Sequence, residues 1–97
     1  MNRNDVLTLI AVTHSVDSLG QRIEAEELRE VFCAVRSVSQ SEFFEAGRSG
    51  LKPAYQFNVD MFDYAEEDTV EFNGIRYRVY RSYCRPDETV ELYTEKL

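Results

Sequence analysis

Cysteine and histidine are scarce in this sequence, which leaves little material for disulfide or metal chemistry. Its 97 residues include two cysteines, Cys33 and Cys84, far apart in the chain, and His14 is the sole histidine. A disulfide framework normally shows more cysteines at closer spacing, and a zinc site would lack a plausible set of ligands. We therefore expect both cysteines to be buried, reduced thiols, and we expect no metal site.

Positive charge and long apolar stretches are also lacking. Eleven Lys and Arg stand against 18 Asp and Glu, for a formal net charge of −7. Tight binding to DNA or to an anionic membrane draws mostly on clustered positive charge, so neither is expected as the main function. No apolar run approaches the roughly 18–20 residues of a membrane span, and the first residues do not lead into a signal-type segment. The sequence thus favours a protein that is made and kept in a cytoplasm.

What the sequence does contain is the composition and patterning of a single folded β domain over residues 1–97. Hydrophobic residues make up 43% and charged residues 30%, as in ordinary soluble domains, and the length leaves room for only one core. Runs of β-branched and aliphatic residues, or an alternation of apolar and polar residues, favour strands. Such patterns occur over residues 5–13, 28–38, 54–61, 70–72, 75–80 and 89–94.

The clearest local signal is the pair Asn73-Gly74 between alternating apolar residues. Both residues tolerate positive φ, so the pair is typical of the type I′ turn of a hairpin. The polar residues 21–27 fit either a strand end or a short helix. Together, five to six short strands and one short helix predict a mainly all-β fold, a small antiparallel β-barrel or sandwich.

The single helix is expected after the second strand. Ser39 and Glu42 have the spacing of a capping box, in which Ser39 accepts a hydrogen bond from the third helical amide and Glu42 reaches back. We expect a helix over residues 42–46 that stops at Gly47. The residues from Gly47 to Pro53 should then be irregular and mobile.

An acidic run and the usual catalytic motifs give no specific site. Six acidic residues and no Lys or Arg lie between Asp60 and Glu71. A calcium ion takes several carboxylate oxygens, but the EF-hand pattern is missing and a solvated loop explains the same residues. No nucleophile–base pair stands out around His14, no particular pair of catalytic carboxylates is indicated, and no phosphate-cradling loop follows the glycines. We expect neither an enzymatic activity nor a cofactor.

Positive charge is concentrated between residues 76 and 85, a stretch that contains four arginines and no Asp or Glu. Basic residues interleaved with tyrosines can hold single-stranded nucleic acid, and they also make good protein interfaces. An ordinary polar face with cross-strand ion pairs explains them as well. With the net negative charge, association between like subunits suits this surface better. The candidate interface residues are Arg76, Arg78, Tyr80, Arg81 and Tyr83.

Taken in order, four parts of the sequence resemble the small head closure, or head–tail joining, proteins of long-tailed bacteriophages. The resemblance runs over residues 28–97, with a weaker match for the first strand. Its parts are the strand 31–38 leading into SQSEFFEA at residues 39–46, the extended segment 53–59, the hairpin 70–79 and the last strand 88–94. Each motif alone is common in small β proteins, and their order and spacing make the match more specific.

The resemblance implies a small β-barrel that assembles as a ring of twelve subunits in the neck of the virion. It implies a portal or adaptor ring and a tail-completion or tail-tube protein as partners, with double-stranded DNA only as the channel contents, and assembly in the host cytoplasm. In stopper-type members, the segment that corresponds to residues 39–53 closes the channel after DNA packaging. The residues of such a channel-closing, mobile segment are Ser39, Gln40, Ser41, Glu42, Phe43, Phe44, Arg48 and Lys52.

Two features of this segment suit such a role. A helix this short is marginal in water, and the glycines beside it cost little to rearrange. Because Phe43 and Phe44 are adjacent, a helix can turn only one of them onto the barrel and leaves the other for a neighbouring subunit. The alternatives are a small β-barrel interaction module, for instance a tail completion protein, and a nucleic-acid-binding barrel that uses the arginines.

Overall fold

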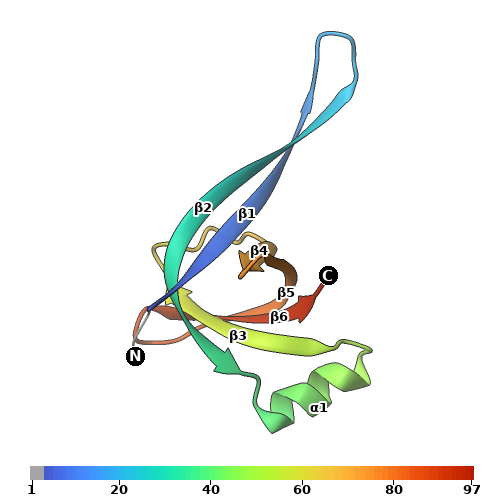
Figure 1. Ribbon diagram of the computed structural model, residues 1–97. Coiled ribbons are helices and arrows are strands. Elements are labelled where there is room, and N and C mark those ends of the chain that lie inside the picture. Colours follow the sequence, from blue (N-terminus) through green and yellow to red (C-terminus); the bar gives the residue numbers. More distant parts are fainter. Residues whose placement is uncertain (1–3) are drawn as a thin grey trace.

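Six antiparallel strands close into a barrel, and one helix lies alongside strand β3 (Figure 1). The structure is a computed structural model that describes residues 4–97. Around the barrel the strands follow the order β1-β2-β3-β6-β5-β4, which confirms the small all-β barrel with one short helix. The elements in chain order are β1 (Asp5–Val16), β2 (Arg22–Ser37), α1 (Gln40–Arg48), β3 (Pro53–Asp60), β4 (Thr69–Phe72), β5 (Ile75–Cys84) and β6 (Thr89–Lys96).

The core lies inside the barrel, and every strand contributes to it. Phe57 and Val59, which the alternation in residues 54–61 predicts on one face of their strand, are both fully buried. The Phe57 ring lies 5.3 Å from the Phe72 ring and 5.9 Å from the Tyr77 ring, centroid to centroid. Burying a large apolar side chain stabilises a fold by about 1.5–3 kcal/mol, so this aromatic cluster holds β3 against β4 and β5.

The predicted hairpin turn is confirmed. Phe72 pairs with Ile75, and the two residues between them have φ values of 51° at Asn73 and 79° at Gly74. Both values lie in the left-handed region that a type I′ turn needs, and this turn matches the natural twist of the two strands. The Asn-Gly pair therefore sets the register of β4 with β5.

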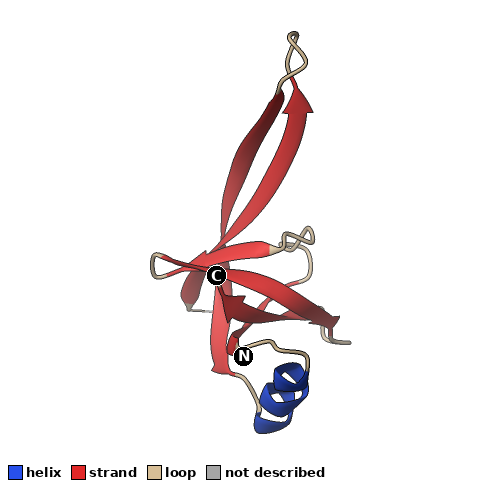
Figure 2. Ribbon diagram, turned by 90° about the vertical axis from the view of Figure 1, so that its right-hand side faces the viewer, coloured by secondary structure: helices blue, strands red, loops and turns tan. Residues whose placement is uncertain are grey.

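The β1–β2 hairpin extends well past the rest of the barrel (Figures 1 and 2). Its ladder runs without a break from Asp5↔Cys33 to Val16↔Arg22. Strand β4 pairs with β1 only over residues 8–10, and β3 pairs with β2 only over residues 34–37. Residues 11–27, named the projecting arm below, thus form a two-stranded ribbon, and the molecule measures 50 Å along its long axis against 30 and 26 Å across.

The polar stretch at residues 21–27 belongs to this arm. Its residues from Arg22 onward are strand and not helix, because each of them pairs with a residue of β1. Strand β2 is 16 residues long, more than the stretch that the apolar pattern predicts. The ladder hydrogen bonds to β1, and not a hydrophobic stripe, keep this part of the chain extended.

The two cysteines differ in their surroundings. Cys33 is a fully buried, free thiol of the core, as expected, and burial together with the nearby Asp5 carboxylate raises its pKa to about 11. Cys84 is also free, but it is exposed, so the expectation that both thiols are buried is wrong for this residue. Cys84 ends β5, beside the turn that leads into β6.

Two glycine substitutions should change stability in opposite directions. An added Cβ meets nothing within 4 Å at either Gly74 or Gly47, so backbone conformation alone decides the effect. Gly74→Ala places a side chain at positive φ and should lower the free energy of unfolding by about 1–2 kcal/mol. Gly47→Ala lies inside α1 and should raise it by about 0.5–1 kcal/mol. Urea unfolding measures both, and a loss of the same size at the two positions would contradict the turn assignment.

Candidate functional site

Helix α1 has a defined start and a defined end. The Ser39 hydroxyl accepts a hydrogen bond from the Glu42 amide at 3.2 Å, which confirms the predicted N-cap. At the other end, the Leu51 amide donates to the Ala46 carbonyl at 3.1 Å, and Gly50 has a φ of 81°. This is the hydrogen-bond pattern of a Schellman motif with glycine in the left-handed position.

The helix is therefore longer than the sequence predicts. It spans Gln40–Arg48, not residues 42–46. Gly47 lies within the helix, and Gly50 ends it, because Gly50 has the positive φ that the C-terminal motif requires. The prediction of a stop at Gly47 was wrong.

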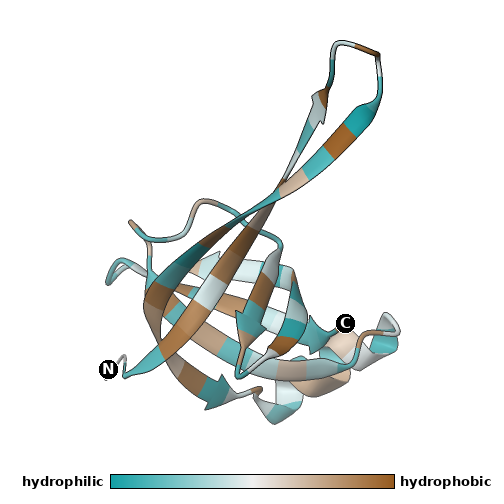
Figure 3. Cartoon of the chain, turned by 45° about the horizontal axis from the view of Figure 1, so that its top comes forward, coloured by the Kyte–Doolittle hydropathy of each residue, from teal (hydrophilic) through white to brown (hydrophobic). Residues whose placement is uncertain are grey.

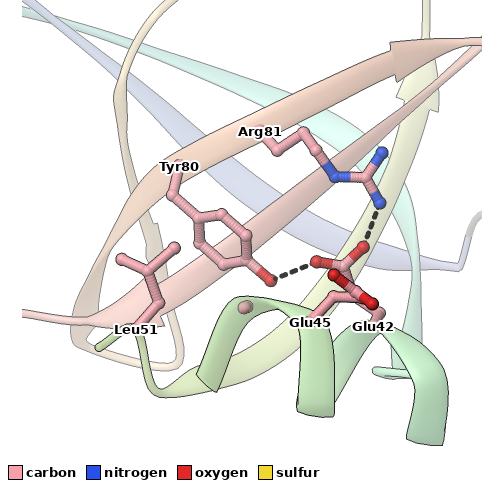
Figure 4. A pocket seen from close by; sticks show the side chains of 6 residues that line it. Glu42, Glu45, Leu51, Tyr80 and Arg81 are labelled. Carbon is pink, nitrogen blue, oxygen red and sulfur yellow. Dashed lines mark hydrogen bonds and ion pairs between the residues drawn. The ribbon is translucent and has the colours of Figure 1, made fainter. Parts of the chain in front are cut away.

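The Glu42 side chain connects α1 to the barrel (Figure 4). The Tyr80 hydroxyl donates to Glu42 Oε2 at 3.0 Å, and the Arg81 guanidinium donates to Glu42 Oε1. The carboxylate thus faces β5 instead of reaching back to the backbone of Ser39, as a complete capping box would require. Burial and the Glu42 carboxylate raise the pKa of Tyr80, which keeps this phenol a hydrogen-bond donor.

A bulge in β5 lets two neighbouring residues reach the same carboxylate. Val79 pairs with Thr94 and Arg81 pairs with Tyr93, so Tyr80 is an extra residue in the ladder. Side chains of consecutive strand residues normally point to opposite faces, and a bulge re-aims one of them. The Arg81 guanidinium also lies 4.1 Å above the Tyr93 ring, in a cation–π contact.

Between α1 and β5 there is an open cavity of about 490 Å³, named the helix cleft below (Figure 4). Ala46 and Leu51, joined by the C-terminal motif of α1, supply apolar surface, and so does the ring of Tyr80. Glu45 stands at the edge of the cleft, with its side chain 72% exposed. The lining residues are Glu42, Glu45, Ala46, Leu51, Tyr80 and Arg81.

The adjacent phenylalanines of the predicted channel-closing segment do not pack as expected. Phe43 and Phe44 are both exposed, and their rings contact each other edge-on, with centroids 6.2 Å apart. Ala46 is the buried residue of the helix. The expectation that one phenylalanine turns onto the barrel is wrong, because Glu42 and Ala46 occupy the side of α1 that faces it. Both rings are left for a contact outside the chain.

The polar residues of the same segment are distributed around α1. At the start of the helix, on either side of Gln40, the hydroxyl oxygens of Ser39 and Ser41 lie 3.4 Å apart. Arg48 forms a surface ion pair with Glu45 at 3.5 Å. The Lys52 amide donates to Glu95 at 3.3 Å. The segment thus lies at one end of the barrel as a helix and a turn.

The arginines of β5 are paired within the chain. Arg76 donates to Glu26 of the projecting arm at 2.7 Å, and Arg78 donates to Glu95 of β6 at 2.7 Å. Arg81 is bound to Glu42, as described above. These contacts match the interpretation as cross-strand ion pairs better than a free basic face. Of the candidate interface residues, Arg76 lies against the arm, Tyr80 and Arg81 lie against α1, and Tyr83 is exposed.

One member of the acidic run is a structural carboxylate. The Glu67 side chain is only 4% exposed, and it accepts hydrogen bonds from Arg29 at 2.6 Å and from the Ala65 amide at 2.8 Å. Arg29 also donates to the Asp63 carbonyl at 2.8 Å, so it holds the β3–β4 loop against β2. Among residues 4–97, no group of three or more acidic, His or Cys side chains is arranged to hold a metal ion.

Comparison with known proteins shows the fold and no function. No protein-family model matches the sequence, and no curated protein matches it. The structure is similar to the solution structure of protein SF1141 from Shigella flexneri 2a, with a TM-score of 0.77 and 12% identity. The match covers 96% of this chain and 91% of that chain. Within the described residues, no helix is long and apolar enough to cross a membrane.

Replacing Glu42 with Ala should loosen α1. The variant loses the charge-assisted hydrogen bond to the partly exposed Arg81 and the Tyr80 contact, together worth about 1–2 kcal/mol. Backbone amides of residues 40–52 should then exchange about tenfold faster or more, while amides of β3 and β6 keep their protection. Glu45→Ala, on the same helix, is the matched control and should have little effect. Equal exchange in the two variants would show that Glu42 does not hold the helix.

The Glu67–Arg29 pair should give stability a measurable pH dependence. Burial raises the pKa of Glu67, but the hydrogen bonds from Arg29 and the Ala65 amide outweigh it and bring the pKa below the ordinary 4.5. The ionised form therefore stabilises the fold above about pH 4.5, and this contribution is lost as the pH falls further. Glu67→Gln should be less stable at neutral pH and should lose less stability on acidification. Thermal unfolding across this range tests it, with Glu66→Gln as the control that should follow the parent protein.

Proposed function

We propose that this protein is a structural, non-enzymatic assembly protein, a ring-forming subunit of the neck that joins head and tail in a long-tailed bacteriophage. Its place is in the virion, between a portal or adaptor ring and a tail-completion or tail-tube protein. Double-stranded DNA passes through the ring as cargo, and an acidic wall repels phosphates and so lets DNA slide. The small all-β barrel, with one helix after its second strand, agrees with the architecture that the sequence resemblance implies.

The observation that carries this proposal is the projecting arm. A two-stranded ribbon by itself is marginally stable in water, since neither face is covered by a core. Yet the arm carries exposed apolar side chains, and in Figure 3 its ribbon is largely hydrophilic with a few hydrophobic segments. They are Val12, Val16, Leu19 and Ile23. Such a ribbon is suited to lie against other subunits, which would supply the missing cover.

A subunit of a ring needs separate contact surfaces for its neighbours. The arm and α1 lie at opposite ends of this molecule (Figure 1). The α1 end carries the exposed pair Phe43 and Phe44. The Glu42 contacts hold the segment at residues 39–53 in place, and their release would free it to move toward a channel axis. This arrangement supports both the joining and the channel-closing roles.

The second candidate is a small β-barrel interaction module outside the neck ring, for instance a tail completion protein. The same arm and the same exposed phenylalanines would serve it. A nucleic-acid-binding barrel receives less support, because Arg76, Arg78 and Arg81 are bound to carboxylates of this chain and are not free for phosphates.

Shortening the arm should abolish assembly and spare the fold. Residues 13–25 are replaced by Asn-Gly, which joins the directly paired Val12 and Glu26 through a two-residue turn. The parent protein should sediment as a monomer or weak oligomer when dilute, because each interface is modest and ring closure supplies multivalency. Mixed with its portal complex, it should add a ring that is visible by electron microscopy. The shortened variant should unfold cooperatively but add no ring.

Two results would overturn the proposal. One is a stable closed ring of the parent protein at nanomolar concentration without any partner. The other is a shortened variant that adds to the portal complex as well as the parent does. Asn73→Asp, in the exposed β4–β5 turn, is the control and should assemble normally, since Asp-Gly forms the same type of turn.

A further inference from the structure

The tip of the projecting arm presents one apolar side chain on a hydrogen-bonded turn. Leu19 is 81% exposed, the highest value among the large apolar residues of the described chain. Asp17 organises the turn, since its carboxylate accepts hydrogen bonds from the Leu19 amide at 2.9 Å and the Gln21 amide at 2.8 Å. The Asp17 amide in turn donates to the Gln21 carbonyl at 3.0 Å. A pre-organised apolar group loses little entropy when it is buried by a partner.

The same tip carries the only arginine of the arm, which has no lysine. Residues 11–27 hold four acidic residues and one arginine, Arg22. Arg22 is exposed, pairs across the ladder with Val16, and forms no ion pair with another described residue. The tip therefore combines an apolar knob, Leu19, with a free positive charge three residues away.

The helix cleft at the other end of the molecule has the complementary chemistry. Its apolar surface comes from Ala46, Leu51 and the Tyr80 ring. Both oxygens of Glu42 are already bound to Tyr80 and Arg81. The carboxylate that remains accessible is that of Glu45, whose sole ion pair among residues 4–97 is the exposed one with Arg48. The cleft thus offers apolar area with one negative charge at its edge.

We propose that the arm tip of one copy inserts into the helix cleft of a second copy of this chain. Leu19 fills the apolar part of the cleft, and Arg22 pairs with Glu45 at its edge. This inference rests on the proposed function, since it specifies how subunits of the ring contact each other. Because tip and cleft lie at opposite ends of the molecule, the contact is head-to-tail, and such contacts form a ring when the rotation closes.

The contents of the cleft favour this occupant over a small polar ligand. Ligand sites fix a small molecule with convergent polar groups, whereas here the Glu42 carboxylate, Tyr80 hydroxyl and Arg81 guanidinium already bind one another. An apolar side chain fills the cleft without breaking those contacts. A nucleic acid or an anionic membrane would meet the repulsion of Glu45 at the edge and of the acidic arm.

Photo-crosslinking tests the contact directly. A benzophenone amino acid replaces Leu19 in the full chain, which is irradiated at high concentration and digested. Mass spectrometry should find the crosslink in peptides that contain residues 42–51 or 80–81 of a second copy. The same probe at Asn73, in the other exposed turn, should give no such product. Crosslinks from position 19 to another surface, or none between copies, would overturn the contact.

A charge exchange tests the ion pair. Arg22→Glu and Glu45→Arg should each weaken self-association about threefold to tenfold, measured by sedimentation, and the double variant should recover to within about twofold of the parent. Leu19→Asp should weaken it at least tenfold, because it removes the buried apolar group. Arg48→Ala leaves Glu45 in place and should not weaken association. Additive losses in the double variant would contradict the pairing.

The portal complex separates this inference from the proposed function. If the parent protein adds a ring to the portal and Leu19→Asp adds it equally well, the tip-to-cleft contact is wrong and the neck function stands. If the parent adds no ring but the position-19 crosslink still maps to the cleft, the neck function fails and the contact between copies stands. A crosslink to a portal subunit instead of a second copy would overturn the choice of partner.

Discussion

The pairing of β1 with β4 is the constraint on which the rest of the structure depends. Three residues of β1, at positions 8–10, meet β4 and close the barrel. Over these three residues β1 has a neighbour on each edge, and beyond Ile10 it pairs only with β2. Because β4 is four residues long, its length determines how much of the first hairpin leaves the wall. One strand pair therefore serves both as barrel wall and as projecting arm.

Much of the barrel could be predicted because its signals are local. The Asn73-Gly74 turn, the alternation that buries Phe57 and the N-cap of Ser39 each depend on residues close together in the sequence. The arm could not be predicted in the same way. Between Arg22 and Glu27 the alternation is weak, because Ile23 and Ala25 are its only apolar residues and Glu27 breaks it, so the pattern does not separate strand from helix. Only the register with β1 makes this stretch a strand.

The helix cleft depends on contacts between distant parts of the chain. Glu42 meets its partners across 38 and 39 residues. The spacing Ser39–Glu42 correctly predicted the cap, but it also suggested a local partner for a carboxylate that bonds to β5. The bulge that brings Tyr80 and Arg81 to the same side has no sequence signal, since register is a property of the paired strands. The arginines of β5 were visible in the sequence, and their carboxylate partners were not.

The arm also has a mechanical consequence. The hydrogen bonds between antiparallel strands run across the strand direction. A pull on the arm tip, directed along its axis, therefore draws β1 and β2 together and slides them past β4 and β3. The hydrogen bonds of the β1–β4 and β2–β3 ladders are then loaded together, in shear. They are not opened one after another, as they would be if the strands were pulled apart from one end. Tension that enters at the tip is thus carried into two walls of the barrel at once.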